Sequence, residues 1–123
     1  MWEVATTAEF DEWFAALVSG GQAEVIAKVN LLKMFGPQLK RPHADTLKGS
    51  KHPNMKELRA DTKQQRLRIA FAFDPKRRAI LLIGGSKLGV SQQRFYKQLI
   101  AKADGLYEAH LAALNTRTQE RGD

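Results

Sequence analysis

RLRIAFAFDP, residues 66–75, is the stretch that decides the fold of this chain. Large apolar side chains alternate with arginines and alanines, which is the period-two pattern of a β-strand. The alternation places the large apolar residues on one face and both arginines on the other. Asp74-Pro75-Lys76 then predicts a tight turn. Because an apolar segment follows at once, we expect an antiparallel hairpin of two strands, over Arg66–Asp74 and Arg78–Gly84.

The segments on either side of this hairpin have other periods. Before it, we expect a short strand over Met1–Ala5, a first helix broken at Gly20-Gly21, a second helix from about Gln22, and a strand over Met55–Ala60. After it, a helix is expected from about Ser91 to Leu114. The order β-α-α-β-β-β-α predicts an α+β domain, with two antiparallel helices and a small, mostly antiparallel sheet.

Residues 37–54 show no periodicity and contain three of the four prolines. An irregular segment of this length inside a compact domain is usually functional or mobile. It is also basic, with Lys40, Arg41, His43, Lys48, Lys51 and His52.

Basic residues are concentrated in the middle of the chain. Sixteen of the twenty Lys and Arg residues, but only four of the thirteen Asp and Glu residues, lie between Lys40 and Lys102, so this segment carries a net charge of +12. The rest of the chain carries −5. Such a concentration of positive charge attracts polyanions, and a nucleic acid is the first partner to consider. A basic surface that only keeps the protein soluble is the alternative.

The composition excludes several kinds of chemistry. The chain has no cysteine, so disulfides, thiolate metal sites and cysteine nucleophiles are absent. Carboxylates are scarce in the basic segment and no metal-binding motif is present, so we expect neither a metal nor a cofactor. The start of the chain lacks a signal-peptide pattern, and no apolar run could span a membrane. We expect a cytoplasmic protein with one domain, residues 1–115, and a polar tail, residues 116–123.

Candidate site residues lie on the predicted strands. Arg68 has only small alanines beside it on its face, which leaves room for a phosphate that an arginine fork could clamp. Arg66 shares that face. For both arginines, the alternative is a solvated strand edge or salt bridges to the acidic helices. Lys87 follows a glycine pair that could bring it close to a phosphate or could simply be a flexible connection. Arg59 and Lys56 lie on opposite faces by parity, so both cannot line one site without a bulge.

Further candidates lie on the last helix and in the long loop. Tyr96 could pack in the core, or its hydroxyl could reach a cleft and pass a proton or stack on a base. His52 could act as an acid or base, although no motif supports it, and His110 is expected to be structural. Contacts to a bound nucleic acid are expected from Lys48, Lys51, His52, Arg66, Arg94 and Lys97.

Several segments are specific enough to suggest a family. These are Glu57-Leu58-Arg59, residues 68–75, residues 77–82, Gly84-Gly85-Ser86-Lys87 and Arg94-Phe95-Tyr96. Together they resemble the phage-derived HigB-like toxins of the RelE/ParE superfamily of type II toxin–antitoxin systems, and the resemblance covers nearly the whole chain. It implies a compact RelE-type fold in which a helical hairpin packs on an antiparallel sheet.

The resemblance also implies a function. Such a protein would be an mRNA interferase, an endoribonuclease that cuts mRNA on the ribosome, inhibits translation and is neutralised by a helix-turn-helix antitoxin. The 2′-hydroxyl of the mRNA would attack the adjacent phosphate without a metal, so the protein must supply positive charge, a base and an acid. A ParE-like gyrase poison and a non-catalytic nucleic-acid-binding module are the alternatives.

Residue by residue, the resemblance assigns a catalytic set. Arg68 matches the strand arginine at the scissile phosphate, Lys87 the basic position after the last strand, and Tyr96 the aromatic residue near the start of the last helix. Arg59 and Lys56 are placed in this set by the basic strand before the hairpin. Glu57 departs from the pattern, since a second lysine is expected there. The general base therefore stays open among Lys56, Lys87, His52 and Tyr96.

Overall fold

The structure, a computed structural model, describes residues 1–120, with side chains to residue 116, and confirms the α+β class. Its elements are β1 (Val4–Thr6), α1 (Ala8–Ala15), α2 (Ser19–Phe35), the 3₁₀ turn η1 (Gly36–Gln38), β2 (Ala44–Thr46), β3 (Lys56–Asp61), β4 (Arg66–Phe73), β5 (Ala79–Ser86) and α3 (Gln92–Glu120). The strand order is β1-β5-β4-β3-β2. Only the β1–β5 pair is parallel among these strands, so the sheet is mostly antiparallel as predicted.

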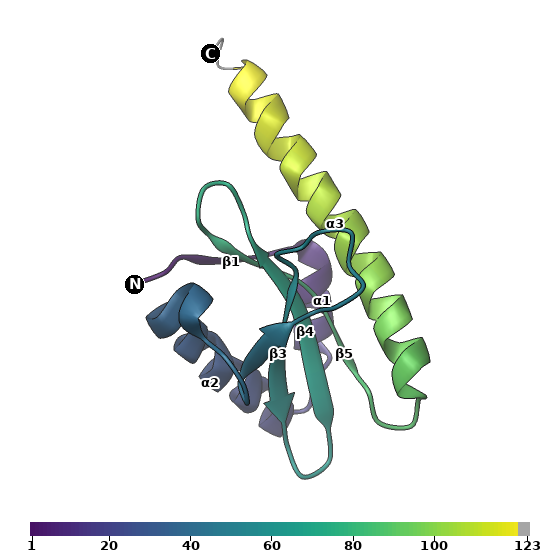
Figure 1. Ribbon diagram of the computed structural model, residues 1–123. Helices are drawn as coiled ribbons and strands as arrows, with labels where there is room; N and C mark the ends of the chain where they lie inside the picture. The colour runs from purple at the N-terminus through teal and green to yellow at the C-terminus, as the bar shows by residue number, and fades with distance from the viewer. Residues whose placement is uncertain (121–123) are drawn as a thin grey trace.

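The sheet separates two apolar cores, as the alternation along β4 requires. Ile69 and Phe71 point to the side covered by α1 and α2, where they pack with Phe10, Val25 and Leu32. Alanines from the other face of β4 pack under α3, in a core with Phe95 and Leu99 of that helix. Figure 1 shows α2 and α3 on opposite sides of the sheet. Arg68 belongs to the α3 side, which is therefore both a core and a polar site.

The predicted break at Gly20-Gly21 is wrong, because both glycines lie inside the first turn of α2. The chain turns earlier, between Ala15 and Ser19. A glycine in the first turn costs the helix little stability, since the N–H groups of that turn make few intrahelical hydrogen bonds. Gly21 also has a packing role: a Cβ there would lie 2.8 Å from Gln65 Oε1.

The structure adds one strand that the sequence pattern did not reveal. Strand β2 lies inside the segment predicted to be irregular and pairs antiparallel with β3. Its three residues are too few to show an alternation, so its formation depends on the neighbouring strand edge. The last helix also continues past Leu114 to Glu120, because neither glycine nor proline stops it there. Residues 121–123 of the predicted tail lie outside the described residues, and the domain boundary at residue 115 stays a prediction.

No helix within residues 1–120 has the length and apolar character needed to cross a membrane.

Gly84→Ala should destabilise the protein by about 1–3 kcal/mol, the usual cost of overpacking a core. Gly84 lies in β5, and a Cβ at this position would overlap the ring of Trp13 on α1. Urea unfolding followed by circular dichroism measures the change.

Gly105→Ala is the matched control, because nothing lies within 4 Å of a Cβ at that exposed helical position. It should stabilise the protein by up to about 1 kcal/mol through helix propensity. Equal effects of the two substitutions would contradict the packing of α1 on Gly84.

Candidate functional site

A buried carboxylate, Glu57, forms the centre of the polar site between the sheet and α3. Its Oε2 accepts hydrogen bonds from Arg59 Nε at 3.2 Å and Nη2 at 3.0 Å, and its Oε1 accepts one from the Tyr96 hydroxyl at 2.6 Å. Alternation along β3 places Glu57 and Arg59 on the α3 side, where α3 brings Tyr96 over them. Glu57 is only 4 % exposed, so these donors replace the water that its carboxylate loses.

Arg68 lies beside this carboxylate and is itself buried. It faces Arg59 in the β3–β4 register, and its Nη1 donates to Asp61 Oδ1 at 2.5 Å and to the Leu67 carbonyl at 2.8 Å. Its Nε has no hydrogen-bond partner within residues 1–120 and lies 3.9 Å from Glu57 Oε1. A buried donor without a partner is costly, so a ligand oxygen that accepted from Nε would gain a strong, charge-assisted hydrogen bond.

The pKa values at the site follow from these contacts. Burial acts to lower the pKa of Arg68, but the interactions of the guanidinium with Asp61 and, to a smaller extent, with Tyr96 outweigh it, so the pKa is raised. Burial, together with the neighbouring Glu57 carboxylate, raises the pKa of Tyr96 to about 12. At neutral pH Tyr96 is therefore a proton donor, and its phenol is too weak an acid to be present as the tyrosinate that a base would need.

An open cavity of about 320 Å³ lies over Glu57, Arg59 and Tyr96. On its outer side, Arg41 Nε donates to Asp45 Oδ2 at 2.7 Å, and Arg59 Nη2 reaches the same oxygen at 3.5 Å. The hydrogen bond from Arg41 lowers the pKa of Asp45. From the outer edge of the cavity inward, the charged side chains therefore alternate in sign as Arg41, Asp45, Arg59 and Glu57. A ligand that enters the cavity meets a cation at its edge and another beside Glu57.

The structure brings together part of the predicted catalytic set. Arg59, Arg68 and Tyr96 meet around Glu57, and Lys48 lines the same cavity. Lys87 lies nearby along the sheet: its backbone N–H donates to the Arg66 carbonyl at 3.0 Å, which continues the β4–β5 pairing beyond Ser86.

Two other predicted residues lie elsewhere. Lys56 belongs to the opposite face of β3 from Arg59, as parity predicts, and lines a different cavity beside Leu39 and Lys40. His52 pairs with Glu108 near the middle of α3, at 3.1 Å. Within the described residues, neither side chain therefore takes part in the contacts among Arg68, Glu57 and Tyr96.

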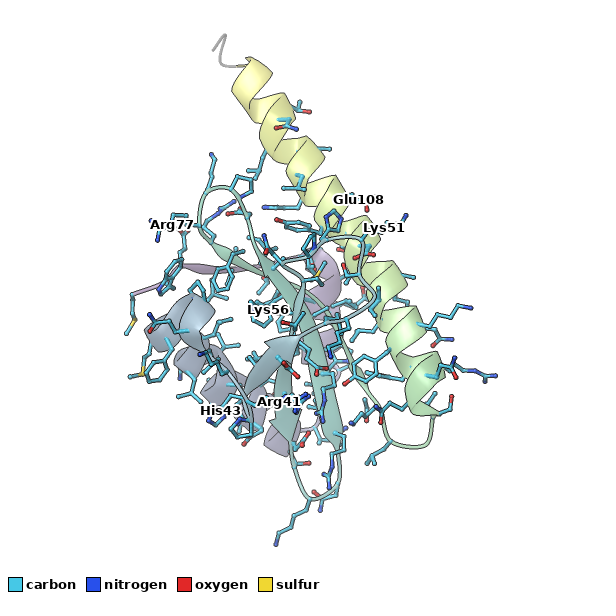
Figure 2. The ribbon with its side chains drawn as sticks, in the orientation of Figure 1. Arg41, His43, Lys51, Lys56, Arg77 and Glu108 are labelled. Carbon is cyan, nitrogen blue, oxygen red and sulfur yellow. The ribbon has the colours of Figure 1, made fainter. Side chains whose placement is uncertain are left out.

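The remaining predicted RNA contacts differ in their freedom to bind. The backbone N–H of Lys51 donates to Asp104 Oδ2 on α3 at 3.0 Å, and Figure 2 shows Lys51 at the α3 side of the view, away from Arg41. Arg66 uses its Nη1 to hold the β3–β4 turn, through the carbonyls of Thr62 at 2.7 Å and Gln65 at 3.2 Å. The two predicted contacts at the start of α3, Arg94 and Lys97, are exposed.

His110 is structural, as expected. It bonds to the buried carboxylate of Asp74 at 2.9 Å, and Arg78 bonds to the same oxygen. Burial acts to raise the pKa of Asp74, but these hydrogen bonds outweigh it, so the pKa is lowered. His110 therefore anchors the β4–β5 turn to α3.

Sequence reasoning missed the carboxylates of the site. Glu57 stands out in the sequence only as a departure from a lysine pattern, although its parity with Arg59 already places it on the face of Arg68. Asp45 and Asp61 give no comparable signal, and the strand that carries Asp45 has no visible period. Among residues 1–116, no three His, Asp or Glu side chains are grouped in a way that could hold a metal ion.

In a Tyr107→Phe background, where Tyr96 is the only phenol, we expect the absorbance of tyrosinate to develop with a pKa of about 12. Adding Glu57→Gln should lower this pKa, because the negative charge that opposes ionisation is lost. It should stay above the ordinary value of about 10, because burial remains. Ultraviolet titration measures both values, with circular dichroism as a check on folding.

An unchanged pKa in the Glu57→Gln protein would contradict the contact between the two side chains.

Comparisons with known proteins identify the family of this chain. The family model described as "Phage derived protein Gp49-like (DUF891)" matches residues 12–108. A Mycobacterium tuberculosis protein described as "Putative toxin HigB3" is 45% identical over 106 residues, which cover 85% of this chain and 90% of that protein. Another from the same organism, "Putative toxin HigB2", is 42% identical over 98 residues, which cover 79% of this chain and 48% of that protein.

A solved structure shows the same fold. E. coli toxin RelE in the free state, as a mutant with two arginines replaced by alanine, has a TM-score of 0.59 at 10% identity, covering 82% of this chain and 95% of that one. At this identity the similarity concerns the fold alone. The family match and the two mycobacterial relatives confirm the predicted resemblance, and the solved structure has the same fold. The chain belongs to the Gp49-like family of phage-derived proteins, the HigB-like toxins with a RelE-type fold.

Proposed function

We propose that this toxin is a metal-independent endoribonuclease that cuts mRNA on the ribosome, inhibits translation in the cytoplasm and is held inactive by a helix-turn-helix antitoxin. The observation that supports the proposal is the placement of Arg68, with its unpaired Nε, beside a carboxylate and a protonated phenol. RNA can supply its own nucleophile, so these three groups are sufficient for the reaction type.

The reaction proceeds by attack of the RNA 2′-oxygen on the adjacent phosphorus. Glu57 is the base that takes the 2′-hydroxyl proton, since its carboxylate lines the open cavity. Arg68 stabilises the charge on the phosphorane through the Nη1 that Asp61 leaves when the phosphate displaces it. The bond from phosphorus to the 5′-oxygen breaks, and Tyr96 gives that oxygen a proton. The products are a 2′,3′-cyclic phosphate and a 5′-hydroxyl.

This assignment narrows the choice of base that the sequence left open. Lys56 and His52 lie away from Glu57, and the pKa of Tyr96 suits an acid rather than a base. Lys87, whose backbone N–H donates to the Arg66 carbonyl, would add positive charge at this end of the sheet.

In the free protein, the groups proposed to act on the substrate are bonded to one another. Asp61 occupies Arg68 Nη1, and Tyr96 donates to Glu57. A phosphate that displaced Asp61 would exchange one anion for another, and Asp61 could turn outward because its side chain is 46 % exposed. The ribosome would supply the orientation that free RNA lacks, through contacts with exposed cations such as Lys48, Arg94 and Lys97.

Arg68→Ala should reduce mRNA cleavage in a translating extract by roughly 10²–10³-fold, the usual cost of one transition-state donor. Mapping the 5′ ends of the mRNA after addition of purified protein measures this loss. Glu57→Gln, which keeps the shape and removes the base, should reduce cleavage similarly.

Two variants make the result interpretable. Lys76→Ala, at an exposed turn, should cleave like the parent, and Arg68→Lys tests whether a charge without the guanidinium fork is enough if Arg68→Ala folds poorly. Intact mRNA with the parent protein would refute the ribonuclease proposal. Blocked DNA supercoiling in the same experiment would point to gyrase, and neither effect to a binding module.

A further inference from the structure

A second basic cavity lies next to the proposed reaction cavity, with a volume of about 530 Å³. The two share Arg41, Asp45 and Thr46, so they adjoin across strand β2. The lining of the second cavity includes Lys40 and Lys56, and it is completed by apolar residues of the α2–β2 connection. Lys56, which the family resemblance placed in the catalytic set, therefore faces a different space from Glu57.

The second cavity is more positive than the first. Its lining carries three cations, Lys40, Arg41 and Lys56, against the single carboxylate of Asp45. The reaction cavity also has three cations, but Asp45 and Glu57 oppose them. Unneutralised positive charge in a concave, partly desolvated site attracts anions more strongly than the same charge on a flat surface.

The two lysines are available for a ligand, whereas the arginine is shared. Asp45 is already bonded to Arg41 and approached by Arg59. Among the side chains that the structure describes, no carboxylate lies within ion-pair distance of Lys40 or Lys56. Arg41 is 71 % exposed at its side chain and belongs to both cavities, so it can contact anions on either side of β2.

We propose that this cavity binds a phosphate of the RNA backbone next to the one that is cleaved, with Lys40 and Lys56 as its ligands and Arg41 as the bridge between neighbouring phosphates. The inference rests on the proposed function, since it places the same RNA in both cavities. RNA fits because its phosphates recur at every nucleotide, and a strand that enters the first cavity must leave across its rim. Lysine is suited to this task as a point charge that needs no fixed geometry.

The subsite positions the strand and takes no part in bond breaking. Its loss should weaken binding and its salt dependence, while cleavage at saturating RNA should be unchanged. A residue of the catalytic set would show the reverse pattern, which separates Lys56 from Arg68.

The test measures binding of a single-stranded RNA that carries 2′-O-methyl groups throughout and so cannot attack its own phosphates. Lys40→Gln/Lys56→Gln should lower the affinity by roughly 25-fold at about 0.1 M salt and reduce the slope of log K against log [salt] by about 1.4, as expected for two lost contacts to single-stranded RNA. Fluorescence anisotropy over a salt series gives both numbers.

The matched control is Lys76→Gln/Lys102→Gln, which removes the same charge from exposed positions outside both cavities. Equal binding by the two double variants would overturn the subsite. Loss of single-turnover cleavage at saturating RNA in Lys40→Gln/Lys56→Gln, with folding intact, would also overturn it and return Lys56 to the chemistry. If the parent protein bound this RNA but cut no mRNA, the ribonuclease proposal would fail while the binding comparison still decided the subsite.

Discussion

Strand β4 is the middle strand of the sheet and is buried on both faces, so each of its side chains must pack or find a partner. On the α1–α2 side it packs with large apolar residues. On the α3 side it carries Arg68, and a buried guanidinium requires compensating charge. Glu57 and Asp61, both from the neighbouring strand β3, provide it. The antiparallel register of β3 on β4 is therefore also the device that assembles the site.

Glu57 and Asp61 compensate the charge of Arg68 only in part. Asp61 holds one end of the guanidinium and Glu57 lies beyond hydrogen-bond distance of the other, so Nε stays unpaired although it is buried. Tyr96 meanwhile uses its hydroxyl to satisfy Glu57. The folded protein thus keeps its donors and acceptors close to one another without fully neutralising them. Preorganised polarity of this kind acts on a developing charge without the reorganisation that water would need.

The sequence predicted the elements whose hydrophobic pattern runs over many residues. It did not predict the elements that are too short to show a pattern. Alternation over residues 66–73 predicted β4 and both of its faces, whereas the three residues of β2 carried no period. The glycine pair misled because the role of a glycine depends on its place in a helix, which local sequence does not show. At the site, parity separated Lys56 from Arg59 correctly. Only the three-dimensional structure shows the importance of Glu57, because its partner Tyr96 is 39 residues away in the sequence.

A group of exposed acids lies away from the two basic cavities. Glu9, Asp11 and Glu12 are exposed on α1, which packs on β5. Both basic cavities lie at the opposite edge, along β2. The acids of α1 repel an approaching polyanion, and the cations of the β2 edge attract it. Encounters in which the β2 edge faces the polyanion are therefore favoured, and the association rate should fall as ionic strength rises.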